Sequence, residues 1–252
     1  MISGYTIASD VVDRDYCITE CVESLAAVCD EVVVGYSQSS DTTGELLSDL
    51  CYRVPSLRIV AAPVDFNVRN GGPMWMINWM DSVRRQLKGD YQVYLDADEV
   101  IDPRCADEIL EGERRGRALV CTRLNFWGRL DRIAPSGYFC GHKVIRCAPT
   151  KFMLPSDFPV GPDVCPVITQ AHRSDVRIFH YCTLRKPDAF HRKSLVFQPA
   201  LVGKYDYRID AAMKADGHWS DQFSWKEPFV QFDGKHPTVA HSWLRERGYR
   251  PD

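Results

Sequence analysis

The 252-residue chain lacks the features that assign many proteins to a class at once. No apolar run approaches the length of a membrane helix, so no transmembrane segment is expected. Ile2–Ala8 resembles a strand and carries neither the basic region nor the long apolar core of a secretory signal. The ten cysteines include no Cys-x-x-Cys pair and are scattered through apolar segments, as buried free thiols are. These absences predict a reduced, cytoplasmic protein without structural zinc.

A strong charge of one sign is also absent. The net charge of −3 gives the chain no general attraction to nucleic acid or to an anionic membrane. A hydrophobic content of 45% and a charged content of 26% are typical of a globular protein. Three local basic clusters are expected to be solvated surface: Arg114, Arg115 and Arg117; His191, Arg192 and Lys193; Arg245, Arg247 and Arg250.

The first half of the chain alternates strand patterns with helix patterns. Val32–Tyr36 is a nearly continuous apolar run, which is typical of a parallel strand covered on both faces. The other expected strands are Ile2–Ala8, Leu57–Pro63 and the run that begins at Tyr91, and the expected helices are Tyr16–Cys29, about Thr42–Leu50, Pro73–Leu87 and about Pro103–Arg115. This order predicts an α/β fold with a mainly parallel, right-handed sheet flanked by helices.

The pattern changes after Gly116. Ala118–Phe126, Tyr138–Arg146 and Val176–Tyr181 resemble strands, and Pro187–Val202 resembles a helix. We expect one domain over residues 1–204 and a C-terminal extension over 205–252 that packs on it. The irregular, aromatic segment 219–243 allows no assignment of secondary structure.

The most informative stretch is acidic. The buried-strand pattern at Tyr91–Leu95 ends in Asp96, Asp98, Glu99 and Asp102, at the edge of the sheet where α/β proteins bind ligands. Asp96 and Asp98 are two residues apart, so on an extended strand they would share a face. Their oxygens would suit Mg²⁺ or Mn²⁺ carrying a diphosphate. Alternatively, these carboxylates cap helices and complement helix dipoles.

In the order of its strands, helices and polar motifs, the chain resembles the inverting glycosyltransferases of family 2, which have the GT-A nucleotide-sugar fold. The resemblance covers about the first 200 residues and is greatest to the branch that extends bacterial lipopolysaccharide cores and surface glycans. It is carried by Ile2–Ile7, Asp30–Val34 with Ser39–Thr43, Tyr94–Glu99, Asn125–Gly128, Lys143–Arg146, and His180-Tyr181 followed by Arg185.

The resemblance implies transfer of a sugar from a nucleoside diphosphate donor, with a UDP-sugar as the expected donor and with Mn²⁺ or Mg²⁺ assisting. Asp98 would be the direct metal ligand, and Asp96 would contact the ribose or a metal-bound water. His180 stands where many relatives have a second metal ligand, although it could equally be a core histidine. Asp98→Asn would then leave the fold intact and weaken metal-dependent donor binding.

By the same resemblance, the nucleotide would lie across the ends of the first strands. Asp65 would hydrogen-bond a uracil-like base, and Asp41 would lie in a nucleotide-contacting loop or serve only as a helix N-cap. The Gly71-Gly72 turn could approach the diphosphate or be an ordinary turn. The full set of expected donor-binding residues is Ala8, Ser9, Asp10, Asp41, Asp65, Arg69, Gly71, Gly72 and Asp96.

The catalytic base is the least defined part of the resemblance. Relatives commonly have His-Glu or Glu-Asp between the later strands, and residues 151–163 contain neither pair. Asp157 is the first candidate and Asp163 the second, although aspartates beside serine and proline are usually turn residues.

The acceptor is expected to be a glycan or another hydroxyl compound. Aromatic residues near the C-terminus are expected to select it, namely Trp219, Phe223, Trp225 and Trp243. The more common role of such residues is core packing. The alternatives are a hydroxymethylated base in DNA, as in phage glycosyltransferases, a nucleotidyltransferase, and a sugar-nucleotide-binding module without catalysis. A nucleotidyltransferase would normally have a basic, glycine-rich loop after the first strand, where this chain has Ala8-Ser9-Asp10.

Overall fold

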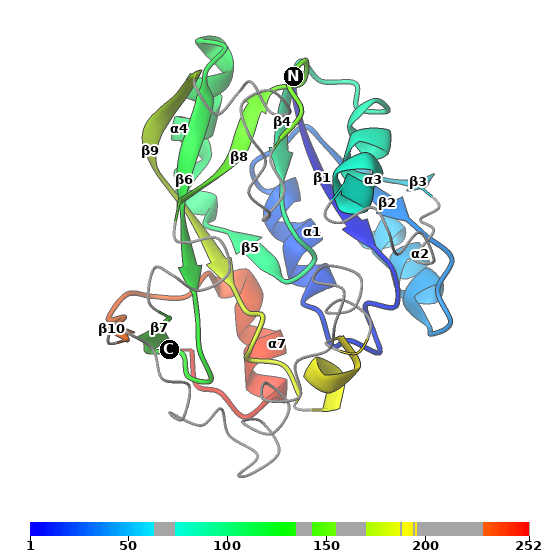
Figure 1. Ribbon diagram of the computed structural model, residues 1–252, viewed down its shortest axis with the longest axis vertical. Helices are drawn as coiled ribbons and strands as arrows, with labels where there is room; N and C mark the ends of the chain where they lie inside the picture. The colour runs from blue at the N-terminus through cyan, green and yellow to red at the C-terminus, as the bar shows by residue number, and fades with distance from the viewer. Residues whose placement is uncertain are drawn as a thin grey trace.

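An eight-stranded sheet organises the part of the chain that the computed structural model describes, which is residues 1–62, 74–134, 143–154, 170–186, 188–193, 195 and 229–251 (Figure 1). Helices cover both faces of this sheet. The α/β class, with a mainly parallel sheet flanked by helices, is therefore confirmed. None of the helices in these residues combines the length and apolar character needed to cross a membrane. The cysteines in the same residues are free thiols.

The strands and helices follow the expected order, with bounds that differ by a few residues. The first part contains β1 (Ile2–Ala8), α1 (Ile18–Ala26), β2 (Glu31–Tyr36), α2 (Thr43–Arg53), β3 (Leu57–Ala61), α3 (Met74–Arg84), β4 (Tyr91–Tyr94), β5 (Glu99–Ile101), η1 (Pro103–Cys105) and α4 (Ala106–Arg114). The second part contains β6 (Ala118–Asn125), β7 (Arg132–Ile133), β8 (Lys143–Pro149), β9 (Ala171–His180), β10 (Val230–Gln231), η3 (Thr238–Ala240) and α7 (His241–Glu246).

The first half of the sheet is parallel, as predicted. The described strands lie in the order β3-β2-β1-β4-β8-β6-β9-β5, and β3, β2, β1 and β4 run parallel to one another. Since α1, α2 and α3 connect these strands, the carboxyl ends of β1, β2 and β4 meet at one edge. Among the described residues, those expected to bind ligands at or after these strand ends are Ala8, Ser9, Asp10, Asp41, Asp96 and Asp98.

The second half of the sheet is mixed. β8 pairs antiparallel with β4 and β6, β6 pairs parallel with β9, and β5 pairs antiparallel with β9. Strand β5 was not expected, because a three-residue strand is too short to show a periodic pattern. Val100 and Ile101 bury completely there, and the chain turns back into the sheet directly after the acidic motif.

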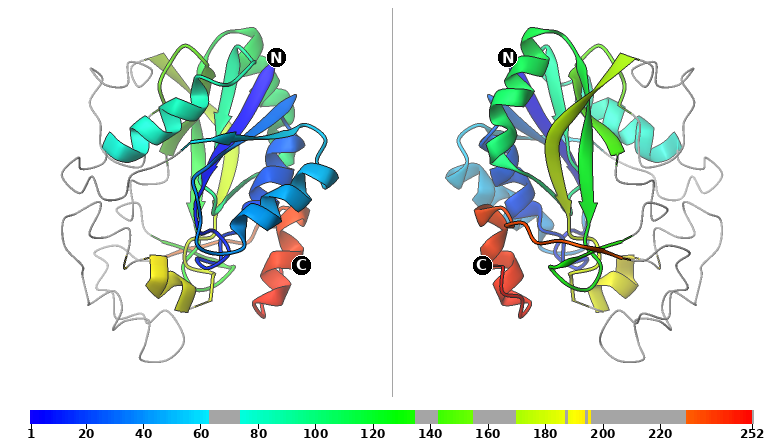
Figure 2. Two further views of the ribbon diagram at one scale, coloured as in Figure 1. Left: turned by 90° about the vertical axis from the view of Figure 1, so that its right-hand side faces the viewer. Right: turned by 90° about the vertical axis from the view of Figure 1, so that its left-hand side faces the viewer.

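Each face of the sheet has its own hydrophobic core. Residues of α1, α2 and α4 pack on one face, and residues of α3 pack on the other, as the edge-on views show (Figure 2). A glycine permits close approach on each side. A Cβ at Gly4 would lie 3.1 Å from Leu25 of α1, and a Cβ at Gly35 would lie 2.2 Å from Val83 of α3. Larger residues at these positions would separate helix from sheet.

The C-terminal elements pack on the same body. Trp243 and Leu244 of α7 share a buried cluster with Phe179 of β9 and with Phe126 and Tyr181, which directly follow β6 and β9. Trp243 is only 6% exposed, so its ring serves the core and is not a free stacking surface. The other three aromatic residues expected to select the acceptor, and the proposed boundary at 204/205, lie outside the described residues.

Glu20 of α1 makes the stability of this region depend on pH. It lines a groove beside α7 together with Glu23, Glu246 and Arg247. Burial, with a smaller contribution from Glu23, raises the pKa of Glu20 from 4.5 to about 7. The folded state therefore holds a proton that the unfolded state has lost between these values, and stability should fall as pH rises through this window.

We expect Glu20→Gln to stabilise the protein by about 1–3 kcal/mol above pH 7 and to have no effect near pH 4, since the neutral amide avoids burying a charge. Urea unfolding at a series of pH values would measure this. Glu23→Gln, on the same helix but more exposed, is the control and should be nearly neutral throughout. A stabilisation that does not vary with pH would show that Glu20 does not titrate as described.

Candidate active site

The two aspartates after β4 point toward different partners, which corrects the expectation of a shared face. Strand β4 ends at Tyr94, and the backbone N–H of Glu99 donates to the carbonyl of Asp96 across 2.9 Å, so the motif forms a turn. The Asp96 carboxylate accepts from the Tyr94 hydroxyl at 2.6 Å and from Arg146 Nη2 at 2.7 Å. Asp98 instead belongs to a separate buried cluster.

Asp98 is the centre of that cluster. Its Oδ2 accepts from Arg185 Nη2 at 2.5 Å and from Lys193 Nζ at 2.9 Å, and its side chain is 5% exposed. Burial alone would raise the pKa of Asp98, but Lys193, His180 and Arg185 lower it well below its ordinary range. Asp98 is therefore a carboxylate at neutral pH, surrounded by cationic groups.

His180 closes the cluster from the end of β9. Its Nε2 lies 3.6 Å from Asp98 Oδ1, and its Nδ1 lies 2.8 Å from the side-chain oxygen of Asn125 on β6. Burial lowers the pKa of His180, but Asp98 and Cys182 outweigh this and raise it to about 10. The structure thus brings His180 and Asp98 together, as the metal prediction requires, in a buried position that also suits the alternative of a core histidine.

Cys182 is a further member that the sequence did not reveal. Its side chain is buried, and its Sγ lies 3.3 Å from Lys193 Nζ. Burial raises the pKa of this thiol, but Lys193, His180 and Arg185 lower it to about 7, so much of it is thiolate at neutral pH. The ligand atoms of Asp98, His180 and Cys182 all lie within 4.8 Å of one another, close enough to hold one metal ion.

The two cations lie against the first loop of the chain, which holds Arg185 by a hydrogen bond. Arg185 donates to the backbone carbonyls of Arg14 and Cys182, and its guanidinium lies 4.3 Å from the ring centre of Tyr16. Lys193 lies 5.2 Å from the same ring. Lys193 comes from residues 188–193, which form the short yellow helix in Figure 1, inside the expected helix 187–202. The prediction that Lys193 belongs to solvated surface is wrong, since the lysine faces Asp98.

Aspartate carboxylates hydrogen-bond the loop after β1 to the loop after β2. Asp10, which has a φ of 46°, accepts from the backbone N–H and the hydroxyl of Ser40 at 2.7 and 3.1 Å. Asp41 accepts from the backbone N–H groups of Asp13 and Thr43 at 2.7 and 3.0 Å. Burial alone would raise the pKa of Asp41, but these hydrogen bonds lower it below its ordinary value.

Thr42 is the N-cap residue of α2 and makes no side-chain capping hydrogen bond, whereas Asp41, one residue earlier, accepts from the backbone N–H of Thr43, the first residue of the helix. Ala8 and Ser9 are buried, so their expected contact with a nucleotide also stays a prediction. Donor contacts by Asp10 and Asp41 stay a prediction. Six expected site residues lie outside the described residues: Asp65, Arg69, Gly71, Gly72, Asp157 and Asp163.

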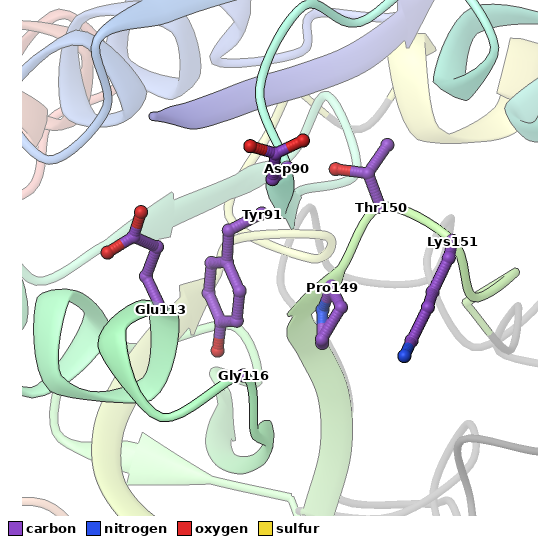
Figure 3. Close-up of a pocket in the computed structure, with 7 residues that line it drawn as sticks. All are labelled: Asp90, Tyr91, Glu113, Gly116, Pro149, Thr150 and Lys151. Carbon is purple, nitrogen blue, oxygen red and sulfur yellow. The ribbon is translucent and has the colours of Figure 1, made fainter.

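A surface cavity of about 350 Å³ opens elsewhere, near the amino end of β4 (Figure 3). Its lining consists of Asp90, Tyr91, Glu113, Gly116, Pro149, Thr150 and Lys151. It shares no lining residue with the Asp98 cluster, which follows the opposite end of the strand. The candidate active site is therefore defined by its charged side chains and not by this cavity.

No family model and no curated protein sequence matches the chain. Among solved structures, TarS 1-349 from S. aureus is 14% identical with a TM-score of 0.46, over 77% of this chain and 64% of that chain. A putative glucose-1-phosphate thymidylyltransferase from Bacillus anthracis is 10% identical with a TM-score of 0.47, over 82% and 96%.

Glucosyl-3-phosphoglycerate synthase from Mycobacterium tuberculosis, solved with Mn²⁺, uridine diphosphate and glucosyl-3-phosphoglycerate, is 17% identical with a TM-score of 0.36. The match covers 49% of this chain and 44% of the synthase. The chain thus spans less than two thirds of the length of the TarS fragment and less than half of the synthase. At these identities and TM-scores, the similarity says nothing about substrate or activity.

Proposed function

We propose that the chain is a GT-A glycosyltransferase that moves a sugar from a nucleoside diphosphate sugar, of the UDP class, to a hydroxyl acceptor. The observation that carries the proposal is the buried cluster of Asp98, His180, Arg185 and Lys193 at the carboxyl edge of the parallel strands. Ligands of open α/β sheets bind at this edge. Lys193, the most exposed of the four side chains, is the group best placed to meet the diphosphate.

The donor atoms of the cluster also fit a divalent cation. Asp98 and His180 would hold it, and when bound it would neutralise charge that develops on the departing diphosphate. Arg185 would hold the Asp98 carboxylate in position through its 2.5 Å hydrogen bond. Asp96 stays engaged with Tyr94 and Arg146, which favours a role beside the nucleotide over metal ligation.

The remaining steps rest on the family resemblance. Asp157 is proposed to remove the proton of the acceptor hydroxyl, with Asp163 as the competing residue, and transfer is proposed to invert the anomeric centre. The proposed acceptor is a glycan. A hydroxymethylated DNA base is the alternative, and a steep loss of activity with added salt would identify it, because phosphate contacts release counterions.

A thermal-shift series with UDP, GDP, CDP and dTDP, each with and without Mn²⁺, tests donor binding. We expect UDP with Mn²⁺ to raise the melting temperature most, since a ligand at 100 times its Kd adds about 2.7 kcal/mol to stability. Lys193→Met should remove most of the UDP shift. Lys186→Met is the matched control, because its exposed side chain lies in the same segment outside the cluster.

Two results would contradict the proposal. One is that no nucleoside diphosphate shifts the melting temperature, and the other is that Lys186→Met weakens UDP binding as much as Lys193→Met. Slow release of free sugar from a UDP-sugar without acceptor would distinguish an enzyme from a binding module. Release of pyrophosphate from a nucleoside triphosphate and a sugar phosphate would identify a nucleotidyltransferase instead.

A further inference from the structure

We propose that Asp98, His180 and Cys182 form a three-ligand site that binds a thiophilic divalent cation, of the zinc and cobalt class, through one carboxylate, one imidazole and one thiolate. This inference deepens the proposed function and rests on it for the role of the metal. It differs from the ligand set that the sequence suggested, which was Asp96, Asp98 and His180, because Cys182 takes the place of Asp96.

The geometry carries the first step. The three ligand atoms lie within 4.8 Å of one another, and each of the three residues is buried. In metal sites, the bonds from the ion to nitrogen and oxygen are about 2.0–2.2 Å long and the bond to sulfur is about 2.3 Å. Ligand atoms bound to one ion are therefore about as far apart as the three atoms are here. Asp96 does not join this group among the described residues, since its two oxygens face Tyr94 and Arg146.

Lys193 marks where a cation binds. Its ammonium lies 2.9 Å from Asp98 Oδ2 and 3.3 Å from Cys182 Sγ, so a positive charge is already bound between two of the three ligands. The lysine side chain is long and 19% exposed, in contrast to the fixed Arg185. A divalent cation would displace the ammonium and release it toward the anionic donor.

The surrounding contacts hold the ligands as a metal site requires. The Asn125 side-chain oxygen is 2.8 Å from His180 Nδ1, so it can accept that N–H and leave Nε2 facing the cluster. Arg185 Nε donates to the Cys182 carbonyl at 2.7 Å, and the backbone N–H of Tyr181 donates to the Asp98 carbonyl at 2.9 Å. The three ligands are thus positioned before any ion binds.

The ligand types select the class of metal. Mg²⁺ prefers six oxygen ligands, and this group offers the oxygens of a single carboxylate. Thiolate and imidazole favour zinc and its neighbours in the first transition row. A carboxylate and a thiolate together neutralise a dication, so Arg185 and the displaced Lys193 keep the site attractive to a diphosphate.

Cobalt absorption on the full chain tests the proposal. A Co²⁺ titration of the reduced, metal-free protein should produce a thiolate-to-cobalt charge-transfer band together with strong visible bands of low coordination number. Cys182→Ser should lose the charge-transfer band and weaken cobalt binding by more than the about 10–100-fold that changes to outer-shell residues cost. Cys105→Ser is the matched control, since Cys105 is also a buried thiol but lies outside the cluster, and it should keep the band.

Three outcomes would overturn the inference: no charge-transfer band in the wild-type protein, a band that survives in Cys182→Ser, or binding in which excess Mg²⁺ displaces cobalt. Cys182→Ala, with its melting temperature measured without metal, ensures that loss of the band is not loss of the fold. UDP binding is measured on the same samples. UDP binding without a thiolate band would overturn this inference alone, whereas a thiolate band without binding of any nucleoside diphosphate would overturn the proposed function alone.

Discussion

Replacing Asp98 with asparagine is expected to lower the free energy of unfolding by about 3–5 kcal/mol at pH 7, as well as to abolish metal-dependent binding of UDP. The change removes the carboxylate that Arg185, Lys193 and His180 share in a nearly dry site, and it leaves these cations uncompensated. The sequence alone suggested that this substitution would spare the fold, and the buried cluster argues against that. Urea unfolding and calorimetric titration with UDP and Mn²⁺ measure the two effects.

The pH dependence provides a check with a definite sign. The pKa of Asp98 is lowered in the folded protein, so its contribution is present above the unfolded value of about 4 and is lost as pH falls through the lower folded value. The stability gap between wild type and Asp98→Asn should therefore narrow as pH falls below about 4. Asp96→Asn, at a side chain that is 23% exposed, should cost only about 1 kcal/mol. Equal losses for both variants would contradict a special role for Asp98.

Glu99→Gln is expected to cost a similar 3–5 kcal/mol, with no direct effect on the ligands of the Asp98 cluster. Glu99 is fully buried on β5, and its Oε1 accepts from Arg146 Nη2 at 2.9 Å and from Arg123 Nη1 at 3.3 Å. Both arginine side chains are at most 1% exposed. The neutral amide would remove the carboxylate that both buried guanidinium groups share, although Arg146 would keep its ion pair with Asp96.

Equilibrium unfolding in urea measures this loss. Glu23→Gln is the control, because its partner Arg53 is half exposed and exposed ion pairs contribute about 1 kcal/mol or less. If Glu99→Gln lowered the free energy of unfolding no more than the control does, water would have to reach Arg123 and Arg146. The description of these two side chains as buried would then be wrong.

The parallel half of the fold could be predicted because its signals are local. The run Val32–Val34 is buried completely on both faces, and such a strand needs no distant partner to be recognised. Strand β5 could not be predicted in this way. Its three residues become a strand through pairing with β9, nearly 80 residues further along the chain, and no periodicity reports such a contact.

The sequence predicted Asp98 and His180 as members of the site, but it did not predict the residues that surround them. The acidic motif and His180 stand out in the sequence, and the structure places Asp98 and His180 side by side. The group that neutralises Asp98 could not be found, because Lys193 resembles any surface lysine until the fold carries it there. Cys182 was hidden for the same reason, since a lone cysteine in an apolar segment is usually core.

The ion pairs of the site also determine when it forms during folding. Arg185 and Lys193 reach Asp98 across 87 and 95 residues. Closing such long loops costs chain entropy before any contact compensates for it, so local contacts form earlier. We therefore expect the parallel strands and their helices to be structured in the folding transition state and the Asp98 cluster to assemble after it. Substitutions in the cluster would then accelerate unfolding while leaving the folding rate nearly unchanged.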